Sequence, residues 1–97
     1  MYLVVSRWEA MPGKEAEFEE KGRTMRRMMR TLPGVAITEA IRTEQGVLAV
    51  HGYESEEAYT RIVQDEQGPF AKALAEHKLE EVARWLGSER GETIGDE

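Results

Sequence analysis

The stretch LPGVAITEAIRTEQGVLAVHGYESEEAY, residues 32–59, contains the pattern that decides the fold. Its opening LPG ends a preceding helix, because proline cannot continue one and glycine frees the turn. The alternating, β-branched run at residues 35–42 predicts a strand, and VLAVHGY at residues 47–53 predicts another. The EQG between them is typical of a tight turn, so the two strands are predicted to form a hairpin.

Elements on both sides of this hairpin follow from similar signals. YLVVSRW, residues 2–8, predicts a strand, and after the turn MPGK a helix begins near Lys14 and runs to the LPG. Beyond the hairpin, Ser55 is suited to N-cap a short helix, EEAYTRIVQ. Pro69 is suited to the first position of a last helix, which the apolar spacing extends to about Leu86.

The resulting order, β-α-β-β-α, is the split βαβ pattern of ferredoxin-like α+β domains with an antiparallel sheet. With 97 residues, the chain is long enough for one domain and too short for two. The tail at residues 88–97 carries one branched apolar residue, Ile94. It is expected either to add a weak edge strand or to be mobile, and the sequence does not separate these alternatives.

The first and third predicted strands carry apolar side chains on both faces. Leu3 and Val5 alternate with Val4 on the first strand, and Leu48 and Val50 lie among further apolar residues on the third. Two helical segments cover only one face of such a sheet, so the other face needs a partner. The simplest partner is a second copy of the same sheet, which predicts a homodimer.

Composition and charge exclude several classes of function. The chain has a formal net charge of −6, which disfavours phosphate backbones, so no nucleic-acid partner is expected. It has no cysteine, which excludes disulfides and thiolate chemistry. The apolar start of the chain lacks a basic segment before it, and no run approaches the ~20 apolar residues of a membrane span. No membrane association and a cytoplasmic location are therefore expected.

The arginine-rich stretch RTMRRMMR is the one candidate for a basic patch. On a helix, its four arginines fall within an arc of about 100°: Arg23, Arg26, Arg27 and Arg30. Apolar residues gather on the opposite side at core spacing: Phe18, Gly22, Met25, Met28, Met29 and Leu32. An amphipathic helix with a solvated arginine face is therefore predicted.

The run GYESEEAY, from Gly52 to Tyr59, resembles a motif of the antibiotic biosynthesis monooxygenase family, whose usual form is Trp-Glu-Ser-x-Glu-Ala-Phe/Tyr. Together with the LPG and the hairpin, the resemblance covers about residues 2–86. It implies a homodimer in which two sheets form an α+β barrel with the helices outside. It also implies a pocket in each subunit between the sheet and the helices.

Members that oxygenate polycyclic aromatics line this pocket with the tryptophan of the motif, an asparagine four residues earlier and a tyrosine six residues later. The corresponding residues here are Tyr53, Ala49 and Tyr59. The resemblance therefore implies a pocket that keeps the tyrosine, replaces the tryptophan with another aromatic residue and lacks the asparagine.

Haem-degrading members carry an asparagine, a tryptophan and a histidine at positions that correspond here to Ser6, Ile62 or its neighbour, and Leu74. The resemblance therefore argues against haem cleavage. His77, one turn beyond Leu74, leaves haem binding open as a third, weaker alternative.

The candidate site follows from strand alternation, family register and helical phase. If Tyr53 faces the pocket, alternation places His51 beside it, and the family register adds Ser6 and Trp8. His51 is the candidate base, because histidine is the side chain whose ordinary pKa lies near neutrality. Tyr59 is the candidate hydrogen-bond donor to a substrate oxygen. The candidate substrate-binding residues are Ser6, Trp8, Tyr53 and Lys78.

Each assignment has a plainer structural alternative. For His51 the alternative is a core histidine bonded to a neighbour, and for Tyr59 it is a packed aromatic with its hydroxyl at the surface; both are the commoner arrangement for such residues. Lys78 shares an arc with the apolar face of the last predicted helix, where a lysine commonly buries its stem and keeps its ammonium group in water.

No metal site is expected, since the two histidines stand 26 positions apart on different elements, and no cofactor motif is present. Three functions therefore stay open: a cofactor-independent monooxygenase of a small aromatic or quinol, a non-catalytic small-molecule-binding or stress-associated dimer of the same fold, and haem binding.

Overall fold

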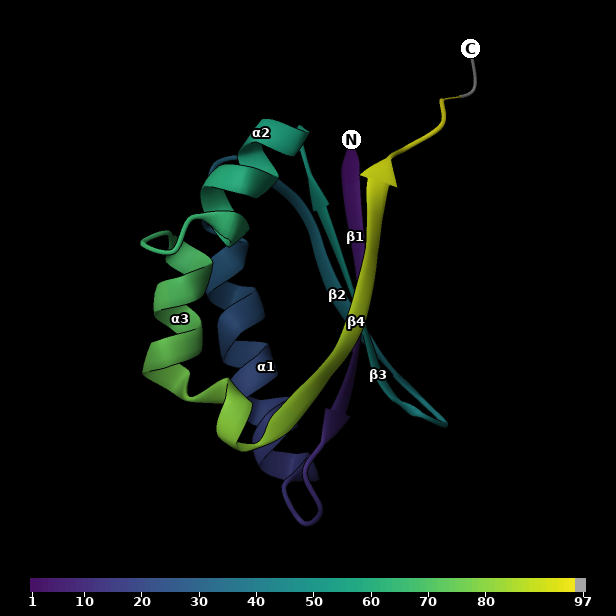
Figure 1. Ribbon diagram of the computed structural model, residues 1–97, viewed down its shortest axis with the longest axis vertical. Helices are drawn as coiled ribbons and strands as arrows, with labels where there is room; N and C mark the ends of the chain where they lie inside the picture. Colours follow the sequence, from purple (N-terminus) through teal and green to yellow (C-terminus); the bar gives the residue numbers. More distant parts are fainter. Residues whose placement is uncertain (96–97) are drawn as a thin grey trace.

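The computed structural model describes residues 1–95. Along the chain its elements are β1 (Tyr2–Ala10), α1 (Glu15–Met29), β2 (Val35–Thr43), β3 (Gly46–Tyr53), α2 (Glu56–Tyr59), a π-helical turn (Thr60–Gln64), α3 (Pro69–His77), a 3-10 turn (Leu79–Glu81) and β4 (Ala83–Glu92). The four strands form one antiparallel sheet in the order β2-β3-β1-β4. The predicted α+β, ferredoxin-like fold is confirmed (Figure 1).

The local signals read from the central stretch have the expected physical causes. The Ser55 hydroxyl accepts a 3.1 Å hydrogen bond from the Ala58 N–H and so caps α2. Pro69 opens α3, as predicted. In the β2–β3 hairpin Gly46 has φ +141°, and a Cβ there would collide with the Trp8 carbonyl oxygen, so only glycine fits.

The prediction that the last helix extends to about Leu86 is wrong. It ends at His77, and Lys78 follows in the left-handed conformation at φ +52°. The chain then turns back and pairs with β1 along its length, with Ala83 opposite Ala10 and Glu92 opposite Tyr2. This pairing satisfies the backbone N–H and C=O groups along the edge of β1, which a longer helix would leave unpaired.

This fourth strand contains the first half of the tail. Residues 88–92 belong to β4, which is ten residues long and lies at the edge of the sheet. The edge-strand alternative is therefore the one observed. Residues 96–97 lie outside the described part of the chain.

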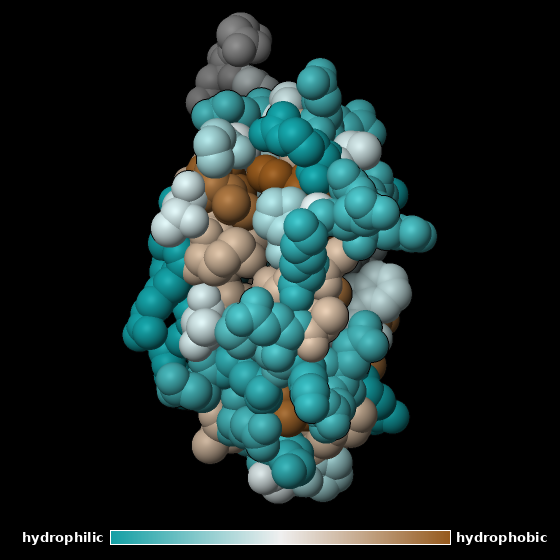
Figure 2. All heavy atoms as spheres, turned by 90° about the vertical axis from the view of Figure 1, so that its left-hand side faces the viewer, coloured by the Kyte–Doolittle hydropathy of each residue, from teal (hydrophilic) through white to brown (hydrophobic). Residues whose placement is uncertain are grey.

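All helices pack on one side of the sheet, as Figure 1 shows. On α1 the buried side chains are Phe18, Met25 and Met29, as the apolar stripe predicted. The outer side of the helical layer is covered largely by hydrophilic side chains (Figure 2). None of the helices within residues 1–95 is long and apolar enough to cross a membrane.

The other face of the sheet has no helix of the described chain against it. By alternation with the cavity-facing residues, Leu3 and Val5 of β1 and Leu48 and Val50 of β3 lie on this side. Ile41 of β2 pairs with Leu48, which places it on the same face, and it is 54% exposed. We refer to these five residues as the open face.

Candidate functional site

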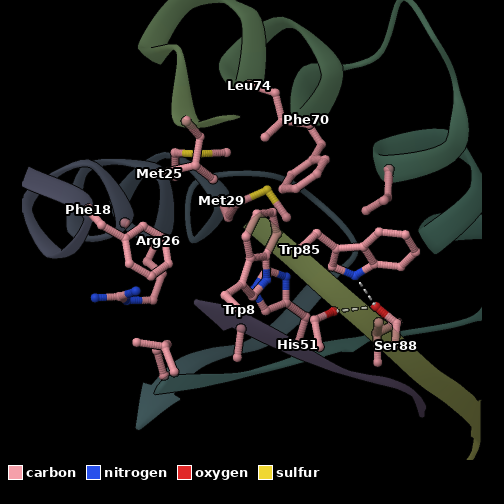
Figure 3. Close-up of a pocket in the computed structure, with 18 of the residues that line it drawn as sticks. Trp8, Phe18, Met25, Arg26, Met29, His51, Phe70, Leu74, Trp85 and Ser88 are labelled. Atoms are coloured by element: carbon pink, nitrogen blue, oxygen red, sulfur yellow. Dashed lines mark hydrogen bonds between the residues drawn. The ribbon is translucent and has the colours of Figure 1, made fainter. Parts of the chain in front are cut away.

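A cavity of about 590 Å³ lies between the sheet and the helices, within the usual range of small-molecule pockets. Most of its wall is apolar, and the residues that form this part are Val4, Trp8, Phe18, Met25, Met29, Ala40, Ile41, Val47, Ala49, Val63, Phe70, Leu74, Leu79 and Trp85. The close-up shows Trp8, Met29, Phe70 and Trp85 directed towards one space from the sheet and the helices (Figure 3). Such a wall suits a flat aromatic ligand.

Five of the six side chains predicted for the site line this cavity. The structure places Ser6 and Trp8 on β1, His51 and Tyr53 on β3, and Tyr59 at the end of α2. Alternation accounts for the strand residues, because positions two apart point to the same face. Their position on one wall does not by itself assign a chemical role to any of them.

Lys78 is the exception, and its placement is a correction. It is exposed and is not among the residues that line the cavity. The argument from helical phase fails because α3 ends one residue earlier, at His77. His77 also lies outside the lining, and its carbonyl oxygen accepts a 2.6 Å hydrogen bond from Lys21 Nζ.

The polar centre of the cavity wall is the pair His51 and Tyr53. Nδ1 of His51 lies 3.2 Å from the Tyr53 hydroxyl oxygen. Burial lowers the pKa of His51 to about 4, with the positive charge of Arg26 adding to the effect. Burial also raises the pKa of Tyr53, and Tyr59 adds to this. Both groups are therefore neutral at physiological pH.

The hydrogen bond within this pair determines which nitrogen of His51 faces a ligand. Tyr53 is 1% exposed, so its hydroxyl proton needs a protein acceptor, and His51 Nδ1 is the one within hydrogen-bonding distance among the described residues. This arrangement favours the tautomer with hydrogen on Nε2. In that tautomer His51 offers the cavity a donor rather than a basic lone pair.

Tyr59 completes an aromatic cluster beside this pair. Its ring centroid lies 5.5 Å from that of Tyr53 and 5.3 Å from that of Tyr2. The Arg90 guanidinium lies over the Tyr59 ring, 5.6 Å from its centroid. These contacts fix the ring of a side chain whose hydroxyl makes no hydrogen bond among the described contacts.

Two cavity residues on β4, Trp85 and Ser88, were missed by the sequence reasoning. Trp85 Nε1 donates a 2.9 Å hydrogen bond to Ser88 Oγ, which lies 2.7 Å from Ser6 Oγ (Figure 3). Both were missed because Trp85 was assigned to the last helix and Ser88 to the tail. Gly87 gave no warning, because a glycine is also typical of the residue after a helix; the strand propensity of Val82 and Trp85 was the available signal.

Charged side chains of α1 and β2 form the rim of the cavity. Arg42 donates two hydrogen bonds to the Glu19 carboxylate, 2.6 and 2.8 Å long, and Arg23 donates one of 2.7 Å to Glu20. Arg26 also lines the cavity and is half-buried, whereas the helical pattern predicted a solvated position for it. Within residues 1–95 no cluster of three or more His, Asp or Glu side chains is arranged to hold a metal ion.

No protein-family model matches this sequence, and no curated protein matches it. The fold does match solved structures. SnoaB, a cofactor-independent oxygenase from Streptomyces nogalater, superposes with a TM-score of 0.74 at 16% identity, over 97% of this chain and 93% of that one. Rv0793 from Mycobacterium tuberculosis gives 0.76 at 14% identity, over 98% and 96%.

A third similar structure is a monooxygenase from the gene ActVA-Orf6 of Streptomyces coelicolor, solved in complex with nanaomycin D. It superposes with a TM-score of 0.71 at 20% identity, over 97% of this chain and 88% of that one. At sequence identities this low, the structural similarity shows that the fold is shared and does not show that the reaction is shared. The chain therefore has the fold of the antibiotic biosynthesis monooxygenases, as its central motif suggested.

Proposed function

We propose that this protein is a cofactor-independent monooxygenase acting on a small aromatic or quinol substrate held between its sheet and its helices. The observation that carries the proposal is the cavity of about 590 Å³, whose apolar wall is interrupted by the His51–Tyr53 pair and Tyr59. A flat ligand would lie against the tryptophans and Phe70, with one oxygen directed at the polar groups. The oxygenase fold of SnoaB agrees with this assignment.

The chemistry needs an electron-rich substrate and O₂ as the oxidant. The substrate loses a proton to solvent, which reaches the cavity beside the exposed Trp85, and the resulting anion transfers electrons to O₂. With an anthrone, one oxygen atom forms the new carbonyl group and the other leaves as water with the two hydrogens of the oxidised CH₂ carbon. With a quinol, one oxygen atom forms a hydroxyl group on the ring and the other leaves as water with two hydrogens of the quinol, which becomes a hydroxyquinone. The protein contributes position, exclusion of water and stabilisation of the anion.

The contacts of His51 support a different role from the general base expected from the sequence. A group with a pKa of about 4 is a weak proton acceptor, and the favoured tautomer carries hydrogen on Nε2. We assign His51 Nε2–H and the Tyr59 hydroxyl as donors that hold the substrate oxygen as an anion. Trp8, Tyr53 and Ser6 then shape the wall around it.

A second candidate function is ligand binding without turnover. It is favoured by the weak basicity of His51 and by Ala49, which brings no polar group to the cavity wall. In this case the donors and the apolar wall would hold a finished aromatic product rather than a substrate.

We also propose that the working unit is a homodimer that buries the open face, as the family resemblance implied. Leu3, Val5, Leu48 and Val50 are half-buried and form an apolar strip that no helix of the described chain covers. Pairing with a second sheet would remove this area from water.

Oxygen uptake is the direct test. Metal-free protein is mixed with naphthols, anthrones and quinols in an oxygen electrode, and Tyr59→Phe serves as the site variant. We expect uptake with at least one compound, reduced by roughly tenfold or more in the variant, because a lost hydrogen bond to a charged oxygen has about that effect. Tight binding without uptake would support the second candidate.

A further inference from the structure

Arg26 is the feature of this cavity that the proposed function does not use. It lies on the part of the cavity wall formed by α1, between the apolar side chains of Met25 and Met29 (Figure 3). Its side chain is half-buried. One guanidinium nitrogen lies 3.1 Å from where a Cβ on Gly22 would stand. Glycine at position 22, one turn earlier on the helix, therefore leaves room for this side chain.

Its neighbours on the rim are already paired. Arg23 is bound to Glu20 and Arg42 to Glu19. Arg30, which follows α1 and lies outside the cavity lining, is bound to Glu39. Arg26 makes no ion pair or side-chain hydrogen bond among the described residues. It is thus a half-buried cation on a cavity wall with no anion of its own.

The other charged groups on this cavity leave room for an anion. Glu19 is neutralised by its two bonds to Arg42, and Glu80 is exposed and therefore screened by water. The remaining polar groups, namely Ser6, Ser88, His51, Tyr53 and Tyr59, are neutral side chains. Ser6 and Ser88 are bonded to each other and the Tyr53 hydroxyl to His51, so His51 Nε2–H and the Tyr59 hydroxyl are the donors left for a ligand among the described contacts. The site therefore offers donors beside Arg26 and little negative charge.

We infer that the ligand is an aromatic carboxylate, whose ionised carboxyl group pairs with Arg26 while its ring system lies against the tryptophans. The planar guanidinium fork matches a carboxylate through two parallel hydrogen bonds. Partial burial strengthens this attraction relative to bulk water. The apolar wall supplies the affinity for the rings, and Arg26 selects among compounds of similar shape.

This inference rests on the proposed function, since it names the substrate class for the same cavity. It is separable from that function in experiment, because it concerns discrimination between two ligands of equal shape. Turnover is not needed to measure it.

The test is calorimetric titration of the full chain with 2-naphthoate and with 2-naphthamide, which differ in charge and hardly in shape. We expect naphthoate to bind at least about tenfold more tightly. Arg26→Gln should abolish this preference by weakening naphthoate alone, and Arg26→Lys should retain part of it. Arg27→Gln, which removes an exposed arginine at the next position outside the cavity, should leave the preference intact.

Equal affinity of the wild type for the two probes would overturn the carboxylate inference while leaving the proposed function standing. A preference that survives in Arg26→Gln would overturn it as well. If neither probe binds, the inference is overturned and aromatic binding in this cavity is contradicted with it. The wild-type comparison decides the matter even if Arg26→Gln fails to fold, which circular dichroism would reveal.

Discussion

At the scale of single residues, the His51–Tyr53 hydrogen bond controls what the cavity presents to a ligand. The sequence predicted that both side chains share one wall, because strand alternation is a strict rule. The sequence did not predict the tautomer of His51. The tautomer depends on the burial of Tyr53, whose hydroxyl uses His51 Nδ1 as its hydrogen-bond acceptor. A candidate base thereby becomes a candidate donor.

The tautomer is directly measurable. In nitrogen-15 NMR spectra of labelled protein at neutral pH, we expect His51 to carry hydrogen on Nε2 and a lone pair on Nδ1. In Tyr53→Phe, which removes the donor to Nδ1, the two tautomers should both be populated. A wild-type His51 with hydrogen on Nδ1 would restore its assignment as a base.

The same residue predicts a pH dependence of stability. Burial lowers the pKa of His51 from 6.5 to about 4, so between these values the unfolded chain binds more protons than the folded one. The stabilising effect is therefore complete above about pH 6.5 and is lost as the pH falls towards 4, by up to about 3 kcal/mol.

The matched variant for this effect is His51→Asn, whose amide oxygen can still accept from Tyr53. Urea unfolding at neutral pH and at a pH of about 4.5 should show a smaller acid loss of stability in the variant than in the wild type. Carboxylates titrate in both proteins and cancel in the difference. Identical acid losses would contradict the buried, uncharged state of His51.

At the scale of elements, the boundary between α3 and β4 was the main failure of prediction. Apolar spacing over residues 69–86 is compatible with one long helix, and it contains no information about the free edge of β1. Pairing with that edge takes precedence over helical propensity from Ala83 onwards. This error affected the predicted site: it left out Trp85 and Ser88, which line the cavity, and it included Lys78, which does not.

The end of α3 depends on a contact between two helices. Lys21 Nζ donates a 2.6 Å hydrogen bond to the His77 carbonyl oxygen, at the negative end of the helix dipole. Lys21→Met should lower the free energy of unfolding by about 1–2 kcal/mol, because it removes this bond and the favourable charge.

Lys72→Met is the control for this prediction, because Lys72 is exposed on α3 and makes no side-chain contact among the described hydrogen bonds and ion pairs. Chemical denaturation should show little change in it. Equal effects of the two substitutions would mean that the Lys21 bond adds no stability.

At the scale of the whole molecule, the predicted fold holds because several weak signals agreed on one order of elements. The two-sided apolar strands carried a further expectation, the homodimer, and the open face is the surface on which it depends. Light scattering at micromolar concentration should give a dimer of twice the 11.0 kDa chain. Val50→Lys, which places a charge in the middle of that face, should shift it towards monomer. A monodisperse wild-type monomer would contradict the dimer.

The central claim, oxygenation without a cofactor in the cavity between sheet and helices, is tested most directly by isotope labelling. Chelator-treated protein is incubated under ¹⁸O₂ with an anthrone or quinol that supports oxygen uptake, and the product is analysed by mass spectrometry. We predict one ¹⁸O atom in the product and the other in water, with product formation reduced in Tyr59→Phe. A product whose new oxygen comes from water, or a rate unaffected by Tyr59→Phe, would contradict the account.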